Sequence, residues 1–150
     1  VDVVKQLSGN ICYVTTNKTF ASLKELFEKN KVNLGDVVFI DTISKTIKKA
    51  PDQDASVYYV SSPGALTELS LVVEKFLRHE FDYLIFDSIN NLSIYNKMPI
   101  CAKFMTSLAN KIKKTKTKAV FYALGDKSDD LAKHVGMFVD KVVEVGEKAK

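Results

Sequence analysis

The residues of this 150-residue chain best suited to chemistry are an acid and a hydroxyl at the end of one apolar run. The run Tyr83-Leu-Ile-Phe is followed directly by Asp87 and Ser88. In open α/β sheets ligands bind beyond the carboxyl ends of the strands, where an acid can orient Mg²⁺ beside nucleotide phosphates. The competing interpretation is an aspartate that caps the next turn through its side chain. Asp87 and Ser88 are therefore candidates for a nucleotide or Mg²⁺ site.

A second candidate is a lysine cluster that could bind the phosphate backbone of nucleic acid. Its five members are Lys111, Lys113, Lys114, Lys116 and Lys118. Lysines are also favoured at the end of a helix, where they offset the negative end of the dipole. We favour this structural interpretation, because no aromatic side chains alternate with the lysines to stack on bases. Lys45, Lys48 and Lys49 would extend the patch only if the fold brought them to the same side.

The sequence gives little support for a metal site or a catalytic cysteine and leaves an anion site before one helix undecided. His79 and His134 have no cysteine or second histidine at ligand spacing, so no metal site is predicted. Cys12 and Cys101 lie in apolar surroundings and are predicted to be core residues rather than nucleophiles. The stretch Ser61-Ser-Pro-Gly64 precedes a helical pattern, and either binds an anion through its N–H groups or simply caps that helix. No catalytic residue is assigned.

Composition narrows the class of protein. The chain is 46% hydrophobic and 27% charged with a net charge of +4, which is typical of a globular protein, and its length suits one domain over residues 1–150. Arg78 is the only arginine, which argues against a dedicated reader of base sequence. No apolar run approaches the roughly 20 residues of a membrane span. Two cysteines are too few for a disulfide framework, so we expect a reducing, cytoplasmic location without a membrane partner.

The candidate site residues must be positioned by secondary-structure elements, and the sequence contains short and long segments that predict them. Short apolar runs rich in β-branched and aromatic residues predict strands at Ile11–Thr16, Val37–Asp41, Val57–Val60, Tyr83–Asp87, Ala119–Leu124 and Lys141–Val145. Between them, stripes at helical spacing begin at Phe20, Leu66 and Ile100, and a short last helix is expected to start with Asp126–Lys133 and to stop near Gly136. The stretch Ser44–Ser56 lacks periodicity and is expected to be a loop. The prediction is an α/β fold of three layers, a mostly parallel twisted sheet with helices on both faces.

Three segments in this order carry a family resemblance. They are Ile11-Cys-Tyr-Val-Thr-Thr-Asn17, Val37-Val-Phe-Ile-Asp41-Thr-Ile and Asp82-Tyr-Leu-Ile-Phe-Asp87-Ser-Ile-Asn-Asn-Leu92. Together they resemble the core of RecA/KaiC-type ATPases and, more narrowly, an archaeal group of KaiC-like domains, from about Val3 to Gly146. The resemblance implies a RecA-like core in which Asp87 has the Walker B role. It also implies a homo-oligomer, because such proteins commonly assemble edge to edge.

The chain departs from that family at three points. It has no Gly-x-x-x-x-Gly-Lys-Ser/Thr loop to cradle phosphates. Asn17 and Lys18 stand where the family has its catalytic glutamate, and neither is a carboxylate base. Asp126 and Lys127 match the family's polar sensor only loosely.

The missing phosphate loop leaves alternatives open. In the family, the strand before that loop lies between those that match Ala119–Leu124 and Lys141–Val145. Either a strand and a loop upstream of Val1 fill the gap, or those two strands pair directly. The first hypothesis is accordingly a degenerate, non-hydrolysing domain with a binding or regulatory role and a protein partner. The second is a Mg-ATP-binding ATPase whose phosphate loop lies upstream, and the third is a nucleic-acid-associated protein that uses the lysine patches.

Overall fold

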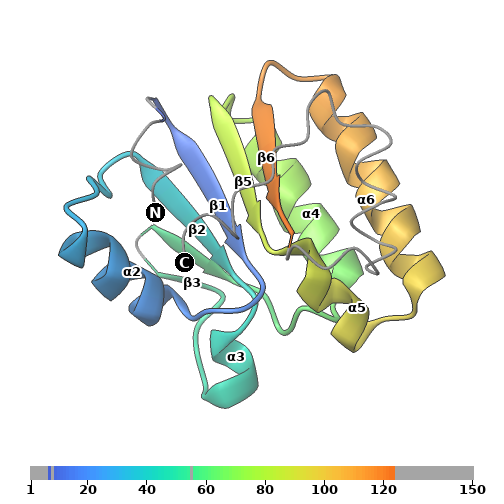
Figure 1. Ribbon diagram of the computed structural model, residues 1–150, viewed down its shortest axis with the longest axis horizontal. Coiled ribbons are helices and arrows are strands. Elements are labelled where there is room, and N and C mark those ends of the chain that lie inside the picture. Colours follow the sequence, from blue (N-terminus) through green and yellow to red (C-terminus); the bar gives the residue numbers. More distant parts are fainter. Residues whose placement is uncertain (1–6, 8, 55, 124–150) are drawn as a thin grey trace, which may run out of the picture.

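The computed structural model describes residues 7, 9–54 and 56–123. They form strands and helices that alternate along most of the chain (Figure 1). In chain order the elements are β1 Ile11–Thr15, α2 Phe20–Lys29, β2 Val37–Asp41, α3 Ser44–Ile47, β3 Gln53–Asp54, β4 Val57–Tyr59, α4 Leu66–Leu77, β5 Tyr83–Asp87, the 3₁₀ turn η1 Ile89–Asn91, α5 Leu92–Tyr95, α6 Met98–Lys113 and β6 Lys118–Tyr122.

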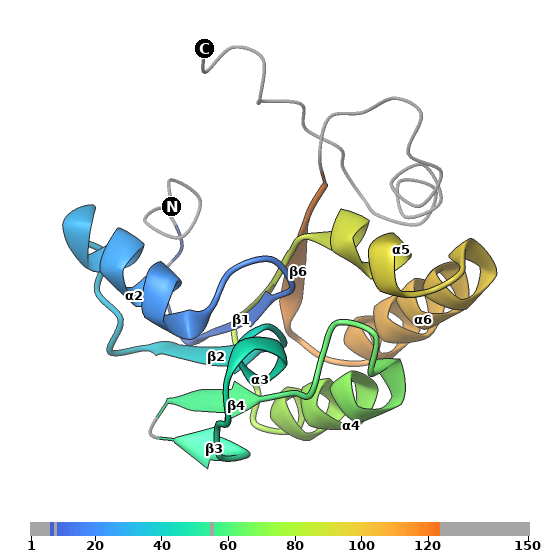
Figure 2. The same cartoon turned by 90° about the horizontal axis from the view of Figure 1, so that it is seen from below.

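The strands form one six-stranded sheet in the order β3-β4-β2-β1-β5-β6. Every pairing is parallel except that of the short edge strand β3 with β4. Figure 2 shows α2 on one side of the sheet and α4 and α6 on the other. The predicted fold class, a mostly parallel α/β sheet with helices on both faces, is confirmed.

Alternating side chains of the strands divide the core into two halves. Cys12 and Val14 of β1 pack in the cluster that includes α4 and α6, whereas Ile11 and Tyr13 pack in the cluster with α2. This is the period of two expected for a strand covered on both faces. Apart from Thr15 and Asp41 at the carboxyl ends of β1 and β2, the buried side chains of these central strands are apolar, which accounts for the nearly continuous hydrophobic runs in the sequence.

The three long helices begin and end close to where their apolar stripes predict. Thr19 is the N-cap of α2, and its hydroxyl accepts a hydrogen bond from the N–H of Ser22 at 3.1 Å. Leu23 and Phe27 form the buried stripe of this helix. In α6 a proline suits the first turn, where a backbone N–H would have no partner within the helix, and lysines in the last turn suit the negative end of the helix dipole.

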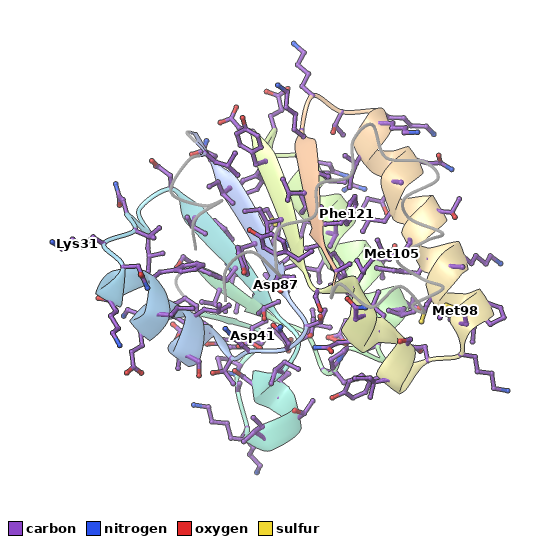
Figure 3. All side chains as sticks on the ribbon, in the orientation of Figure 1. Lys31, Asp41, Asp87, Met98, Met105 and Phe121 are labelled. Atoms are coloured by element: carbon purple, nitrogen blue, oxygen red, sulfur yellow. The ribbon has the colours of Figure 1, made fainter. Side chains whose placement is uncertain are left out.

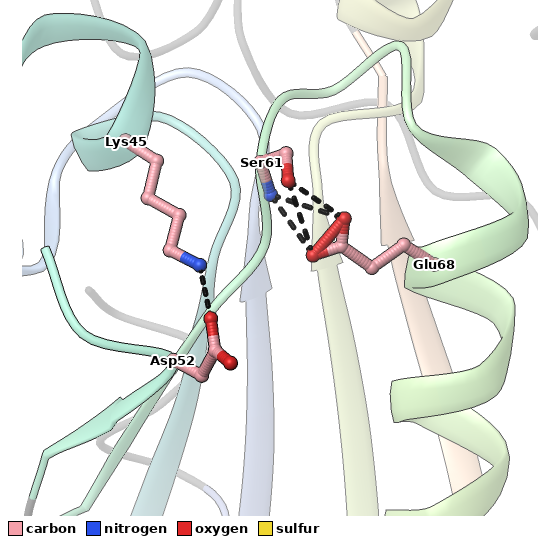
Figure 4. A network of polar contacts seen from close by, with 4 residues as sticks. All are labelled: Lys45, Asp52, Ser61 and Glu68. Atoms are coloured by element: carbon pink, nitrogen blue, oxygen red, sulfur yellow. Dashed lines mark hydrogen bonds and ion pairs between the residues drawn. The ribbon is translucent and has the colours of Figure 1, made fainter. Parts of the chain in front are cut away.

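The expectation of a loop over Ser44–Ser56 is wrong, because this stretch holds α3 and β3. Two tethers supplied by side chains explain the difference. The carboxylate of Asp41 accepts hydrogen bonds from the N–H groups of Ile43 and Ser44, which starts α3. An ion pair between Lys45 and Asp52 then joins α3 to the chain just before β3 (Figure 4). A helix of one turn has no room for an apolar stripe, so periodicity misses it.

Several predictions fall outside the described residues. These are the strand Lys141–Val145, the short helix Asp126–Lys133, and the loose sensor match at Asp126 and Lys127. Within the described part of the chain, no helix has the length and apolar character needed to cross a membrane.

The order of the strands creates a switch in chain direction between β1 and β5. From β1 the chain passes through α2 to β2 on one side, and from β5 it passes through α6 to β6 on the other side. The loops that leave β1 and β5 therefore diverge toward opposite faces of the sheet. In open α/β folds such a point forms the crevice in which ligands bind.

Candidate functional site

Three polar residues stand side by side at the carboxyl ends of the central strands. Thr15 on β1 is in register with Asp41 on β2 and with Asp87 on β5. Figure 3 shows Asp41 and Asp87 at this end of the sheet. The two acids follow the same kind of apolar run, and the structure gives them different environments.

Asp87 holds a carboxylate at the switch point. Its Oδ2 accepts a hydrogen bond of 2.6 Å from the hydroxyl of Tyr13. Its side chain is half-buried, and no buried side-chain oxygen or nitrogen in the described part of the chain lacks a partner. No described residue donates a hydrogen bond to Oδ1, so this oxygen is not bonded within the described part of the chain. Asp87 therefore offers one carboxylate oxygen to a ligand.

Tyr13 is a rigid donor to this carboxylate. Tyr13 is 2% exposed, and its ring packs edge-on against Phe27 at 5.6 Å and in a tilted arrangement against Phe39 at 5.7 Å between centroids. Burial, followed by the negative charge of Asp87, raises the pKa of the Tyr13 phenol well above its usual range. The phenol therefore keeps its proton and can donate it throughout the neutral range.

Ser88 is fixed through its backbone. The hydroxyl of Thr16 donates to the carbonyl of Ser88 at 2.6 Å and accepts from the N–H of Ser88 at 3.0 Å. The side-chain amide of Asn91 donates to the carbonyl of Thr16 at 2.9 Å. The peptide bond between Asp87 and Ser88 is cis. These contacts close the floor of the crevice between the loops that follow β1 and β5.

Both carboxylate oxygens of Asp41 accept hydrogen bonds from within the protein. Its side chain is completely buried and accepts hydrogen bonds from the N–H groups of Phe20, Ile43 and Ser44 and from the hydroxyl of Ser44. The bond from Phe20 places this carboxylate at the N-terminus of α2, where an anion is stabilised. Asp41 thus fills a position that a phosphate group could otherwise occupy.

Asn17 and Lys18 follow β1 and lie next to the crevice, as predicted for the end of that strand. Both side chains are exposed. The hydroxyl of Thr15 donates to the carbonyl of Lys18 at 2.8 Å and accepts from its N–H at 3.1 Å, which shapes this tight turn. The structure therefore brings Asn17 and Lys18 to the same end of the sheet as Asp87 and Ser88. No described residue pairs with the ammonium group of Lys18.

The alternative anion site before α4 is already occupied by the protein itself. The N–H and hydroxyl of Ser61 both donate to the carboxylate of Glu68, at distances from 2.8 to 3.4 Å (Figure 4). The N–H of Gly64 donates to the hydroxyl of Ser62. The stretch Ser61–Gly64 therefore forms a turn before α4 and does not cap it through a side chain, because the N-cap is Ala65 and has no side-chain hydrogen bond.

The lysine cluster lies at the opposite end of the sheet from Asp87. Lys118 begins β6 in register with Tyr83, whereas Asp87 is in register with Tyr122 at the other end of this strand pair. Lys111 is engaged by the hydroxyl of Ser70 at 3.0 Å and by Glu74 at 3.4 Å, while four members remain exposed, namely Lys113, Lys114, Lys116 and Lys118. The lysines of α3 do not extend this patch, because α3 follows the carboxyl end of β2.

Two residues of this site were not singled out from the sequence. The role of Tyr13 has no local signal, because its partner lies on a strand far along the chain. Asp41 does have a local signal, because Ile40-Asp41-Thr42 repeats the order of apolar, acidic and hydroxyl residues in Phe86-Asp87-Ser88.

The described residues form neither a metal-binding group nor a site with a reactive cysteine. Within the described part of the chain, no three His, Cys, Asp or Glu side chains gather in a group that could hold a metal ion. Cys12 and Cys101 are buried free cysteines, as expected of core residues. Burial raises the pKa of the Cys12 thiol, which disfavours the reactive thiolate.

Comparison with protein-family models and with curated proteins finds no match for this chain. The candidate site therefore rests on its own geometry: one open carboxylate oxygen, an exposed lysine and an exposed amide at the switch point of a parallel sheet.

Proposed function

We propose that this chain is a degenerate RecA/KaiC-like domain that binds a partner or ligand at the crevice between β1 and β5 and does not hydrolyse ATP. The proposal rests on the hydrogen bonds made by Asp41 and Asp87, the two acids in register with Thr15. Both oxygens of Asp41 are bonded inside the protein, and one oxygen of Asp87 is held by Tyr13. The loop after β1 supplies Asn17 and Lys18 rather than a carboxylate. Apart from Asp87 at the end of β5, the loops that follow β1 and β5 thus offer no carboxylate base to a water molecule in the crevice.

The fit of Mg-nucleotide to these residues is partial. The open oxygen of Asp87 suits Mg²⁺, which usually takes one or two carboxylate oxygens and keeps several waters. The N-termini of α2 and α4 are offset by Asp41 and Glu68, so they offer phosphates little. A cytoplasmic location belongs to the same proposal, supported by two buried cysteines that form no disulfide.

The proposal is tested by measuring Mg-ATP turnover and, by calorimetry, Mg-ATP and Mg-ADP binding on the full natural chain. We expect no turnover above the protein-free rate. Asp54→Ala is the matched control for Asp87→Ala, because Asp54 is exposed and lies on the edge strand β3. Turnover that is lost in Asp87→Ala and kept in Asp54→Ala would contradict the proposal.

A second candidate is a nucleotide-binding ATPase whose phosphate loop lies upstream of Val1. One observation favours it: among the described residues, β6 pairs with β5 alone. The other edge of β6 therefore has backbone groups to which a further strand can pair. Micromolar binding of Mg-ADP that weakens in Asp87→Ala, together with turnover, would favour this candidate.

The third candidate, nucleic-acid association through the lysine cluster, is tested separately. It requires retention on DNA or RNA that falls steeply with salt and is lost in Lys113→Glu plus Lys114→Glu. Lys24→Glu plus Lys29→Glu on α2 is the matched control, because both residues are exposed on the other face of the sheet. Equal retention of the two double variants would exclude this cluster as the binding site.

A further inference from the structure

A groove runs between α4 and α6 on the outer surface of the molecule, away from the crevice. One hollow of about 290 Å³ lies between the two helices, lined by Leu66, Leu71, Ile100 and Phe104 among others. A second hollow of about 560 Å³ adjoins it, lined in the described part of the chain by α6 and its C-cap, and Lys103 and Ser107 line both hollows. Between Ile100 and Lys114 the groove follows α6 for about 21 Å.

The apolar half of this groove contains large aliphatic side chains that are exposed. Leu71 is 63% exposed and Ile100 is 51% exposed, and the two residues line the same hollow from opposite helices. Two large aliphatic side chains beside a hollow form an anchor site for apolar side chains of another molecule. The hollow between two helices suits the apolar stripe of a third helix.

The polar half of the groove carries one sign of charge. Lys103, Lys111 and Lys114 line it, and within the described part of the chain no acidic residue lines either hollow. Of these three lysines, Glu74 pairs with Lys111, at 3.4 Å, and Glu74 also lies 3.9 Å from Arg78. An occupant with acidic side chains beside its apolar stripe would therefore be matched in both respects.

We propose that the groove between α4 and α6 is a docking surface for an acidic amphipathic helix of a partner protein. An aliphatic anchor favours a helix over nucleic acid, because the only aromatic residue lining either hollow in the described part of the chain is Phe104, which is 8% exposed and offers little ring face for stacking. None of the residues of the site at Asp87 lines either hollow, so this inference goes beyond the proposed function.

The test uses a fluorescently labelled amphipathic peptide of about 18 residues, with leucines on one face and glutamates on the other, titrated with the full chain. The same peptide with lysine in place of glutamate is the control for charge. We expect the acidic peptide to bind and the basic one not to bind. Asp87→Ala is expected to leave this binding unchanged, which separates the result from the outcome for the proposed function.

Two pairs of variants locate the binding. Leu71→Ser plus Ile100→Ser is expected to weaken it by about tenfold, whereas Ile47→Ser on α3 is expected to have no effect. Ile47 is a fair control because it is 70% exposed. Lys103→Glu is expected to weaken binding and Lys24→Glu on α2 to leave it unchanged. None of these exposed positions supports the core, so all the variants are expected to fold.

Three outcomes would overturn the proposal. The first is absence of binding by the acidic peptide, or binding that ignores the serine substitutions. The second is binding of a nucleic-acid duplex that is lost in Lys103→Glu and unaffected by the serine substitutions, which would assign the groove to nucleic acid. The third is self-association that the serine substitutions abolish, which would assign it to a second copy of this chain.

Discussion

The hydroxyl of Tyr13 donates a hydrogen bond of 2.6 Å to Oδ2 of Asp87, although the two residues lie 74 positions apart in the chain. Tyr13 is in register with Ile85 on the neighbouring strand, so Asp87 lies two residues further along on the same face. The strand-end acid is therefore anchored by a core residue. What a ligand meets at this point is an oriented carboxylate with one oxygen already bonded.

Tyr13→Phe removes this hydrogen bond and leaves the ring packing in place. We expect it to lower the free energy of unfolding by about 1–2 kcal/mol, since a hydrogen bond to a charged group contributes about that much and Asp87 is partly solvated. Urea unfolding at neutral pH measures the change. Tyr58→Phe is the control, because the hydroxyl of Tyr58 bonds to no described residue, and an equal loss in both variants would refute the role given to Tyr13.

Alkaline pH is expected to destabilise the protein through Tyr13 and Cys12. Burial, then Asp87, raises the pKa of Tyr13 above its ordinary 10.0, and burial raises that of Cys12 above its ordinary 9.0. Below the ordinary values both groups are protonated in the folded and unfolded states, so their contribution to stability is fully present. Above them the unfolded chain releases protons that the folded chain retains, and stability falls by up to about 1.4 kcal/mol per pH unit and group.

Unfolding in urea at a series of pH values from neutral to alkaline checks this prediction. Tyr13→Phe and Cys12→Ala are each expected to flatten the alkaline decline, whatever they do to stability at neutral pH. A decline of the same steepness in wild type and in both variants would show that other groups cause it.

Asp41→Asn is expected to cost about 3 kcal/mol or more, because an amide can no longer accept hydrogen bonds on both sides and its NH₂ group faces backbone donors. Because the amide keeps a single oxygen, either the N–H of Phe20 or the N–H groups of Ile43 and Ser44 would lose their acceptor. Asp36→Asn is the control, since Asp36 is exposed and its side chain has no described partner, and it should stay within about 0.5 kcal/mol of wild type. Thermal unfolding compares the two variants, and a small effect of Asp41→Asn would mean that these bonds contribute little.

Thr16→Val tests the floor of the crevice. Valine has the shape of threonine but cannot bond to the buried N–H and C=O of Ser88, so we expect a loss of about 2–4 kcal/mol. Thr16→Ser keeps the hydroxyl and is expected to lose about 1 kcal/mol, through the missing methyl group alone. Equal losses in the two variants, measured by urea unfolding, would assign the effect to packing and not to the hydrogen bonds.

The fold could be predicted largely from the sequence, because its strands are covered on both faces. A run such as Val37–Asp41 has few polar residues, which is typical of a central parallel strand, and it forms β2 with the predicted bounds. The elements that periodicity missed, α3 and β3, depend on contacts that are not periodic. The side chain of Asp41 starts α3, and an ion pair of Lys45 with Asp52 precedes β3.

The candidate site could be predicted only in part. Asp87 and Ser88 are identified by their place at the end of an apolar strand, and the same rule applies equally to Asp41. What separates the two acids is the set of donors around each, and these come from distant segments. Tyr13 reaches Asp87 across a strand pair, and the N–H of Phe20 reaches Asp41 from the start of α2. Such pairings exist only once the sheet has formed.

The strands β1 and β5 are tied together beyond both of their ends. At the amino ends, the N–H of Asn10 donates to the carboxylate of Asp82 at 2.8 Å, and Gly9 (φ +103°) leaves room for it, since a Cβ there would lie 2.1 Å from that oxygen. At the carboxyl ends, Thr16 is bonded to Ser88. Sliding of one strand past the other would break one tie or the other. A molecule that enters the crevice must therefore be accommodated by residues 16–19 after β1 and by the segment of η1 and α5 after β5. Amide hydrogen exchange should slow in these two segments on binding and stay unchanged in the strands.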